Sequence, residues 1–391
     1  MINKNKVISF FLALSLMLVV SCEKKVIEPI KNPIPSKYDF KDASNISTVD
    51  INGQKIRLMM LDEMSSITET GNMNVTEQLL LDMYEGKGFS ESSLNASGKK
   101  LSDKVAASID YFSEINNAEQ MSIRTEFKRQ FKELETAYLA KKEASLGSPG
   151  YYLDGGKTRY FSSNGLEPIQ VFKKGMMGAL MMDQTLNNYL STQKLDGGST
   201  RTANTAKLLA TGKNYTEMEH YWDEAFGYVF GQEDNYWAEY IDEVSEDPDF
   251  KDLKPSIYNA FIKGRVAISA GDYPTRDLQI VIIRKQLSKI PAIRAVFYLL
   301  NEARAEMQKD NGRASFHAFS EAYGFISCLK FTHQPNKNAP YFSAQELTQI
   351  LNSLMAGKDG LYDVDYVNNT IEGIAKQIAD RFGFTVAQAI N

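Results

Sequence analysis

Residues 217–229 read Glu217-Met218-Glu219-His220-Tyr221-Trp222-Asp223-Glu224-Ala225-Phe226-Gly227-Tyr228-Val229. This stretch combines a histidine, several carboxylates and an apolar set with helical spacing. Residues four apart share one face of a helix, so His220 and Glu224 point the same way, as do Glu219 and Asp223. The stretch therefore predicts an amphipathic helix that carries a histidine–carboxylate pair.

The same pattern returns later as His317-Ala318-Phe319-Ser320-Glu321-Ala322-Tyr323-Gly324-Phe325-Ile326. Both copies follow His-x-x-x-Glu-Ala-aromatic-Gly-aromatic-aliphatic. Upstream of each copy lies a Phe-x-Lys-Gly motif, at residues 172–175 and 261–264, followed by Asp183 and Asp272 at equal spacing. We therefore expect two related helical units, at about residues 165–232 and 254–331, packed around a pseudo-twofold axis.

The rest of the chain is helical in pattern, which predicts an all-α fold of two pseudo-repeated bundles with a short irregular N-terminal region. Asn52-Gly53 suggests a hairpin turn, but a short turn leading into a helix is favoured there. Residues 151–161 are expected to form a loop or small hairpin, and residues 242–252 an acidic loop. Helices are expected at residues 76–84, 101–115, 118–144, 164–192, 215–229, 255–270, 275–287, 291–308, 313–331, 344–356 and 368–382.

The N-terminus has the features of an export signal. Lys4 and Lys6 precede an apolar run at residues 8–20, which is too short to span a membrane comfortably. Ser21-Cys22 then resembles the lipobox of bacterial lipoproteins, which implies a signal peptide at residues 1–21 and lipidation of Cys22. An ordinary signal peptide with an incidental cysteine is the alternative. Residues 22–36 are expected to form a tether and residues 37–391 the helical domain.

Composition restricts the class of protein. The net charge of −5 and the pI near 5.5 argue against a nucleic-acid partner. After cleavage Cys328 would be the remaining free thiol, so the exported chain must be stable without an intramolecular disulfide. The membrane would be reached through the Cys22 lipid. We expect a lipoprotein of a Gram-negative cell envelope, on the outer membrane or facing the periplasm, with surface exposure left open.

The two histidine helices suggest a metal site. Meeting at a pseudo-twofold axis, they would supply two imidazoles and two carboxylates, a set that suits iron, zinc or manganese in a helical bundle. The predicted ligands are His220, Glu224, His317, Glu321 and Asp223, with Glu219 as a further reserve. The structural alternative is that each buried histidine simply bonds to a carboxylate of its own or a neighbouring helix.

Other chemistry receives less support from the sequence. A His-Glu-x-x-His motif, a Gly-x-Ser-x-Gly elbow and a phosphate-binding glycine loop are all missing. Aspartates at 359, 363 and 365, and at 247, 249 and 252, lack EF-hand spacing and are interpreted as capping or loop residues. The aromatic residues Tyr221, Trp222, Tyr236, Trp237 and Tyr240 could form a binding platform, although helical aromatic stripes usually belong to a core.

Three stretches resemble a family of exported lipoproteins that carry a domain of unknown function: residues 56–63, 174–179 and 218–228. More distantly, the chain resembles the imelysin-like proteins, which are associated with bacterial iron uptake and share Gly-x-His-x-x-Glu. Met218 and Asp223 stand at the glycine and glutamate positions here, and Ser315 and Ser320 in the second copy. The resemblance implies a metal role for His220 and Asp223.

These observations favour a lipid-anchored envelope protein that binds iron or another metal without catalysis. The alternative is a glycan- or protein-binding lipoprotein that uses exposed aromatic residues; burial of Trp222 and Trp237 would remove its basis. A metallopeptidase is a third and weaker hypothesis.

Overall fold

The computed structural model describes residues 33–67, 74–112, 117–232 and 234–391. Helices dominate it, so the predicted all-α fold class is confirmed. The expected signal peptide, Cys22 and most of the tether lie outside the described residues. Among the described helices, none is long and apolar enough to cross a membrane.

The elements follow one another in a nearly all-helical order. They are α1 (Asn52–Ser66), α2 (Glu77–Tyr84), α3 (Ser92–Ala96), α4 (Asn117–Leu139), β1 (Gly150–Asp154), β2 (Lys157–Phe161), α5 (Pro168–Met176), the π-helix η1 (Met177–Tyr189), α6 (Thr192–Leu195), α7 (Thr200–Thr205), α8 (Glu217–Phe230), α9 (Tyr236–Glu246), α10 (Leu253–Ala270), α11 (Tyr273–Leu287), α12 (Lys289–Phe297), the π-helix η2 (Tyr298–Ala303), α13 (Arg304–Glu306), η3 (Asp310–Ser315), α14 (Phe316–Cys328), η4 (Leu329–Phe331), α15 (Ala344–Leu354), η5 (Gly360–Tyr362), α16 (Val364–Phe382) and α17 (Val386–Ala389). The strands β1 and β2 pair antiparallel, so of the two forms expected for residues 151–161 the small hairpin is the one present.

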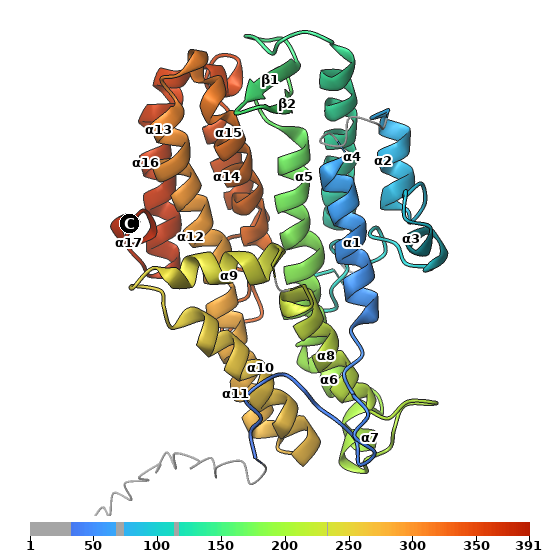
Figure 1. Cartoon of the computed structure of the whole chain (residues 1–391). Helices are drawn as coiled ribbons and strands as arrows, with labels where there is room; N and C mark the ends of the chain where they lie inside the picture. Colours follow the sequence, from blue (N-terminus) through green and yellow to red (C-terminus); the bar gives the residue numbers. More distant parts are fainter. Residues whose placement is uncertain (1–32, 68–73, 113–116, 233) are drawn as a thin grey trace, which may run out of the picture.

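The helices form two neighbouring groups with a shared base. In Figure 1 the orange and red helices α12 to α17 stand beside the blue and green helices α1 to α5, while α8, α10 and α11 extend below. Helix α14 packs on α5 where the two groups meet, and α8 packs on η1 and α10. The proposed two-repeat organisation stays a prediction.

The continuous helix from α5 into η1 runs through the centre. Pro168 begins α5, where a first helical turn tolerates the missing N–H. All thirteen residues of η1 are buried, including the polar Asp183 and Asn187. The sequence predicted one long helix over this region, but periodicity did not reveal that its second half is a π-helix, a form often found at functional positions.

Residues 101–112 correct one prediction, because they form turns rather than the expected helix. Several of their backbone groups bond to distant parts of the protein instead of along a helix. The amides of Ala107 and Ser108 each donate to Oδ2 of Asp183 at 3.0 Å, and Arg124 donates to the Val105 carbonyl at 3.0 and 3.1 Å. These tertiary bonds satisfy the backbone without helical bonds.

The expected acidic loop at residues 242–252 is also partly wrong, because α9 continues to Glu246. The Asn235 side chain accepts from the Tyr236 amide and caps this helix. Trp237, Tyr240 and Ile241 are buried on one of its faces. This apolar face fixes α9 against the bundle, so its acidic residues lie on a helix surface.

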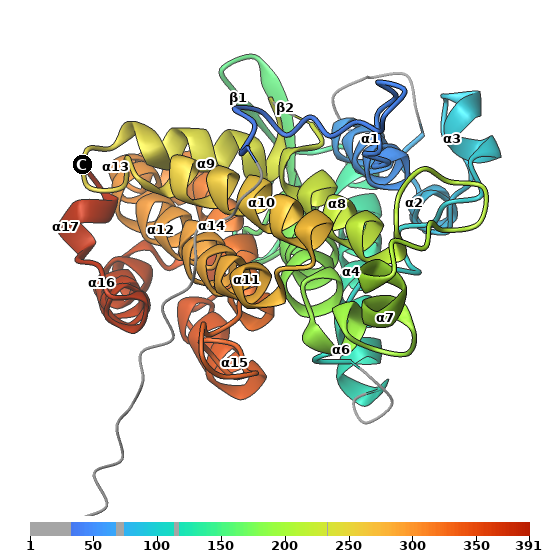
Figure 2. The same ribbon diagram turned by 90° about the horizontal axis from the view of Figure 1, so that it is seen from below.

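The segment that precedes α1 crosses the end of the molecule. We call residues 37–51 the N-terminal strap. It passes over the end formed by α7, α8 and α10 before the chain turns into α1 (Figure 1), and the view from below shows it alongside α9 and α10 (Figure 2).

Candidate functional site

Helix α8 begins with a capping box. The Thr216 hydroxyl accepts from the Glu219 amide at 3.3 Å, and the Glu219 carboxylate accepts from the Thr216 amide at 2.9 Å. Trp222 is fully buried and its indole N–H donates to the Phe261 carbonyl at 2.9 Å. This packing of α8 against α10 leaves the His220 face at the edge of the core.

His220 and Glu224 form the first candidate pair. Nε2 of His220 lies 3.8 Å from Oε2 of Glu224, and the two side chains are 24% and 19% exposed. The imidazole stacks on the Tyr215 ring, with centroids 4.8 Å apart. Nδ1 of His220 is buried and has no hydrogen-bond partner in the described part of the chain. Both side chains of the pair are therefore partly exposed, and Nδ1 of His220 lacks a hydrogen bond among the described residues.

Two neighbouring elements hold the Glu224 carboxylate. Its Oε1 accepts from Nε2 of Gln54 on α1 at 2.9 Å and from the Tyr189 hydroxyl at the end of η1 at 3.1 Å. Burial and the Glu224 charge hold the pKa of Tyr189 well above its usual range, so this phenol remains a donor. These bonds orient Oε1 and leave Oε2 facing His220.

Two half-buried lysines lie beside this pair. Nζ of Lys104 and Nζ of Lys194 each lie 5.6 Å from the centroid of the Tyr189 ring. Burial lowers the pKa of both lysines, and the charge of Glu224 partly opposes that effect. The site thus combines an imidazole and a carboxylate with two nearby ammonium groups.

His317 and Glu321 form the second candidate pair, and both side chains have additional charged partners. Nε2 of His317 lies 3.7 Å from Oε1 of Glu321, a spacing close to that of the first pair. Its Nδ1, however, lies 2.6 Å from Oε2 of the buried Glu167 and 2.8 Å from Nη1 of Arg159. Nδ1 of His317 thus lies between a carboxylate and a guanidinium, so this imidazole already has strong partners.

Glu321 is bound by a buried cation. Nζ of Lys174 lies 3.0 Å from its Oε1 and also bonds to the Tyr240 hydroxyl. Burial alone would raise the pKa of Glu321, but the charges of Lys174 and His317 outweigh it and lower that pKa to about 2. The Glu321 carboxylate is therefore an ion-pair partner at neutral pH.

The structure does not bring the two pairs into one cluster. The His220 pair contacts α1 and η1, whereas the His317 pair contacts α5 and β2. Across the described ranges, no group of three or more histidine, cysteine, aspartate or glutamate side chains is arranged to hold a metal ion. Any metal role for these residues must therefore draw on fewer protein ligands than the sequence suggested.

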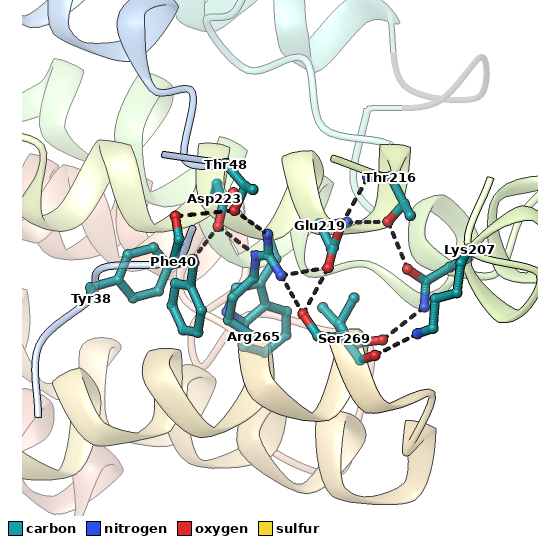
Figure 3. A network of polar contacts seen from close by, with 12 residues as sticks. Tyr38, Phe40, Thr48, Lys207, Thr216, Glu219, Asp223, Arg265 and Ser269 are labelled. Atoms are coloured by element: carbon teal, nitrogen blue, oxygen red, sulfur yellow. Dashed lines mark hydrogen bonds and ion pairs between the residues drawn. The ribbon is translucent and has the colours of Figure 1, made fainter. Parts of the chain in front are cut away.

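Asp223 and Glu219 belong to a separate network, drawn in Figure 3. Arg265 of α10 donates through Nε to Oδ1 of Asp223 at 3.0 Å and through Nη1 to Oε1 of Glu219 at 2.7 Å. The Ser269 hydroxyl also donates to Oε1 of Glu219 at 2.7 Å. Both carboxylates thus face the buried Arg265 and not His220.

The N-terminal strap completes this network. The Tyr38 hydroxyl donates to Oδ1 of Asp223 at 2.5 Å, and Nη2 of Arg265 donates to the Thr48 hydroxyl at 3.2 Å. Burial raises the pKa of Asp223 to about 6, because Arg265 and Tyr38 only partly replace the lost hydration. The network ties the strap to α8 and α10, which is a structural role.

The two tryptophans are buried and offer no surface platform, since Trp222 and Trp237 are both 0% exposed. A different aromatic group contains three half-buried rings and the buried Phe226. Tyr38, Phe226, Phe230 and Tyr258 line a pocket of about 690 Å³ between the strap, α8 and α10. No single stretch of sequence reveals this set, because its members come from the strap, α8 and α10.

The partners of the candidate residues were also missed by sequence reasoning. Lys174 and Arg265 neutralise buried carboxylates, and Gln54 and Tyr189 bind Glu224. The sequence signal for Lys174 is weak, because Lys173 and Gly175 flank it. The structure shows that Lys174 is buried, and a buried lysine needs a carboxylate partner.

The fold and site describe a helical protein with buried charge networks and a partly open histidine–carboxylate pair. The chain belongs to the family described as Domain of unknown function (DUF4856), which matches residues 35–385. No curated protein and no solved structure matches the chain significantly.

Proposed function

We propose that this protein is a non-catalytic, lipid-anchored cell-envelope protein that binds a transition-metal ion, iron or zinc, at His220 and Glu224. The observation that carries the proposal is the contrast between the two pairs. Glu321 is paired with Lys174, whereas Oε2 of Glu224 faces the partly exposed His220 without an ion pair to a lysine or arginine among the described residues. Imidazole nitrogen together with carboxylate oxygen suits both metals.

The resemblance to imelysin-like proteins supports this proposal with one change of ligand. The Gly-x-His-x-x-Glu pattern would pair His220 with Asp223, but Asp223 is fully buried and bonded to Arg265. Glu224, one residue later, shares the face of His220. We therefore assign the carboxylate ligand to Glu224.

Two protein ligands fill only part of the coordination sphere of iron or zinc. The remaining positions would go to water or to a ligand that accompanies the metal. Lys104 and Lys194 favour an anionic companion, because their charges lie beside the pair and would repel a bare cation. A metal bound to a carboxylate chelator, such as ferric citrate, matches this distribution of charge.

Anchoring follows from the expected lipidation of Cys22, which would hold the protein at the outer membrane or another face of the periplasm. The protein would then retain a metal complex close to the membrane.

Calorimetric titration tests the assignment. The chain of residues 23–391, which retains every residue of the described core, would be titrated with zinc and separately with ferric citrate. We expect one binding event for ferric citrate, weakened at least tenfold in a Lys104→Met/Lys194→Met variant, whereas zinc affinity should not fall and should rise as the repulsion is removed. His317→Ala serves as the matched control and should bind both as the wild type does. Absence of binding by the wild type for both ligands would contradict the proposal.

The second candidate is a glycan-binding function in the pocket lined by Tyr38, Phe226, Phe230 and Tyr258. Its supporting observation is the combination of aromatic rings with the charged side chains of the same pocket. Binding of soluble oligosaccharides that is lost in a Phe230→Ala/Tyr258→Ala variant would favour it over the metal proposal. Unchanged binding in that variant would remove it.

A further inference from the structure

A separate cavity lies between α4, α14 and α15, and neither His220 nor Glu224 lines it. It measures about 470 Å³, within the range of small-ligand pockets. Its walls are mainly apolar, with Ile123, Phe127, Val171, Phe331 and Leu351 among the lining residues. We call it the α4–α15 groove.

A glycine shapes the floor of the α4–α15 groove. A Cβ added at Gly175 would lie 2.8 Å from Cε1 of Phe127, closer than real side chains approach one another. Gly175 therefore lets the Phe127 ring rest directly against α5. The floor is therefore formed by the Phe127 ring over Gly175, and an aromatic ring offers an apolar surface suited to a hydrocarbon chain.

Among the residues that the structure describes, one cation of the groove lacks a bonded partner. Lys330 of η4 lines it and is half-buried, and among the described residues its ammonium makes no hydrogen bond or ion pair. Burial lowers its pKa, while the charges of Glu119 and Glu126 oppose that change. A half-buried ammonium without an acceptor is costly, and an anion would satisfy it.

The other charges in the groove cancel one another. Arg129 donates to the Glu126 carboxylate through Nη2 at 2.6 Å and Nε at 2.9 Å. Glu126 also accepts from Gln130 at 2.7 Å. That carboxylate therefore already accepts three hydrogen bonds, and among the described residues Lys330 has only the longer-range charges of Glu119 and Glu126 nearby, with no bonded acceptor.

We propose that the α4–α15 groove binds an amphiphilic monocarboxylate, with its carboxylate at Lys330 and its alkyl chain along the apolar wall. The charge-assisted hydrogen bond fixes the head group. Burial of the chain supplies affinity in proportion to the apolar area removed from water. This site is independent of His220 and Glu224.

The test measures decanoate binding by calorimetry on residues 23–391, with decanol as the uncharged probe of the same chain length. Lys330→Met removes the charge and keeps the length of the side chain, and Lys330→Arg retains the charge. Ser122→Trp places a large ring on an exposed lining position of the groove. Lys128→Met, on the exposed face of α4 outside the groove, is the matched control.

We expect saturable decanoate binding that weakens at least tenfold in Lys330→Met and in Ser122→Trp. Lys330→Arg and Lys128→Met should stay within threefold of the wild type, and decanol should bind at least tenfold more weakly than decanoate. No saturable binding of decanoate by the wild type, or equal binding by Lys330→Met, would overturn the proposal. Thermal melts of each variant establish that the chains compared are folded.

Discussion

Nζ of Lys174 lies 3.0 Å from Oε1 of Glu321, and these side chains are only 3% and 9% exposed. The pair joins α5 to α14 where the two groups of helices meet. Replacing Lys174 with Met would leave the Glu321 charge buried without its main partner. We expect the free energy of unfolding, measured by urea denaturation at pH 7, to fall by about 3–5 kcal/mol.

Lys376→Met provides the control for this prediction. Lys376 pairs with Asp380 one turn away, and these side chains are 68% and 64% exposed. Because exposed pairs contribute little, the control should change stability by less than about 0.5 kcal/mol. Equal effects of the two substitutions would show that Lys174–Glu321 does not stabilise the boundary between the groups.

The Arg265 network predicts a measurable contribution from the N-terminal strap. Tyr38→Phe removes the hydroxyl that donates to Asp223 and preserves the ring that stacks on Phe226. A hydrogen bond to a charged group is worth about 2 kcal/mol, so the free energy of unfolding should fall by that amount. In an Asp223→Ala background the same change should cost much less, and equal cost in both backgrounds would disprove the coupling.

The third histidine predicts a dependence of stability on pH. His333 is buried, its Nδ1 lies 2.8 Å from Oδ1 of Asn187, and burial lowers its pKa to about 3. The folded pKa is below the ordinary value of 6.5, so the unfolded chain binds the proton more readily. The stabilising contribution is therefore present above pH 6.5 and is lost as the pH falls toward 3.

Between pH 6.5 and pH 4 this loss should amount to about 3 kcal/mol at His333. Urea denaturation at both pH values on the wild type and on His333→Gln measures it. The variant should be less stable at pH 6.5 but lose less stability on acidification. A wild-type difference that persists unchanged in the variant would assign the pH dependence to other groups.

The close contact of α8 and α10 predicts opposite effects for two helical glycines. A Cβ at Gly264 would lie 1.9 Å from Cζ2 of Trp222, so Gly264→Ala should lower stability by about 3 kcal/mol through overpacking. Gly373 in α16 has nothing within 4 Å of an added Cβ, so Gly373→Ala should raise stability by about 0.5–1 kcal/mol. Melting temperatures that shift in the same direction for both variants would contradict this packing.

Local sequence signals predicted the elements better than their connections. The helical spacing of residues 215–229 predicted α8, and a loop or small hairpin was expected at residues 151–161, where β1 and β2 pair. The prediction of a helix for the segment at residues 101–112 was wrong. Its bonds to Asp183 and Arg124 join distant parts of the chain, and such bonds leave no periodic signal in the sequence.

The sequence predicted which histidine and glutamate lie together in each candidate pair, but not which side chains surround the pairs. The i, i+4 spacing correctly placed His220 beside Glu224 and His317 beside Glu321. The spacing contained no information on Lys174 or Arg265, which decide whether a carboxylate is available. Such partners depend on how the helices pack, and packing cannot be derived from the period of one helix.

The central claim is that His220, and not His317, holds a metal. The most direct measurement is the metal content, by inductively coupled plasma mass spectrometry, of residues 23–391 after loading with iron or zinc and removal of excess metal. The account predicts about one metal ion per chain in the wild type and in His317→Ala, and less than a tenth of that amount in His220→Ala. Equal metal content in all three proteins would contradict it.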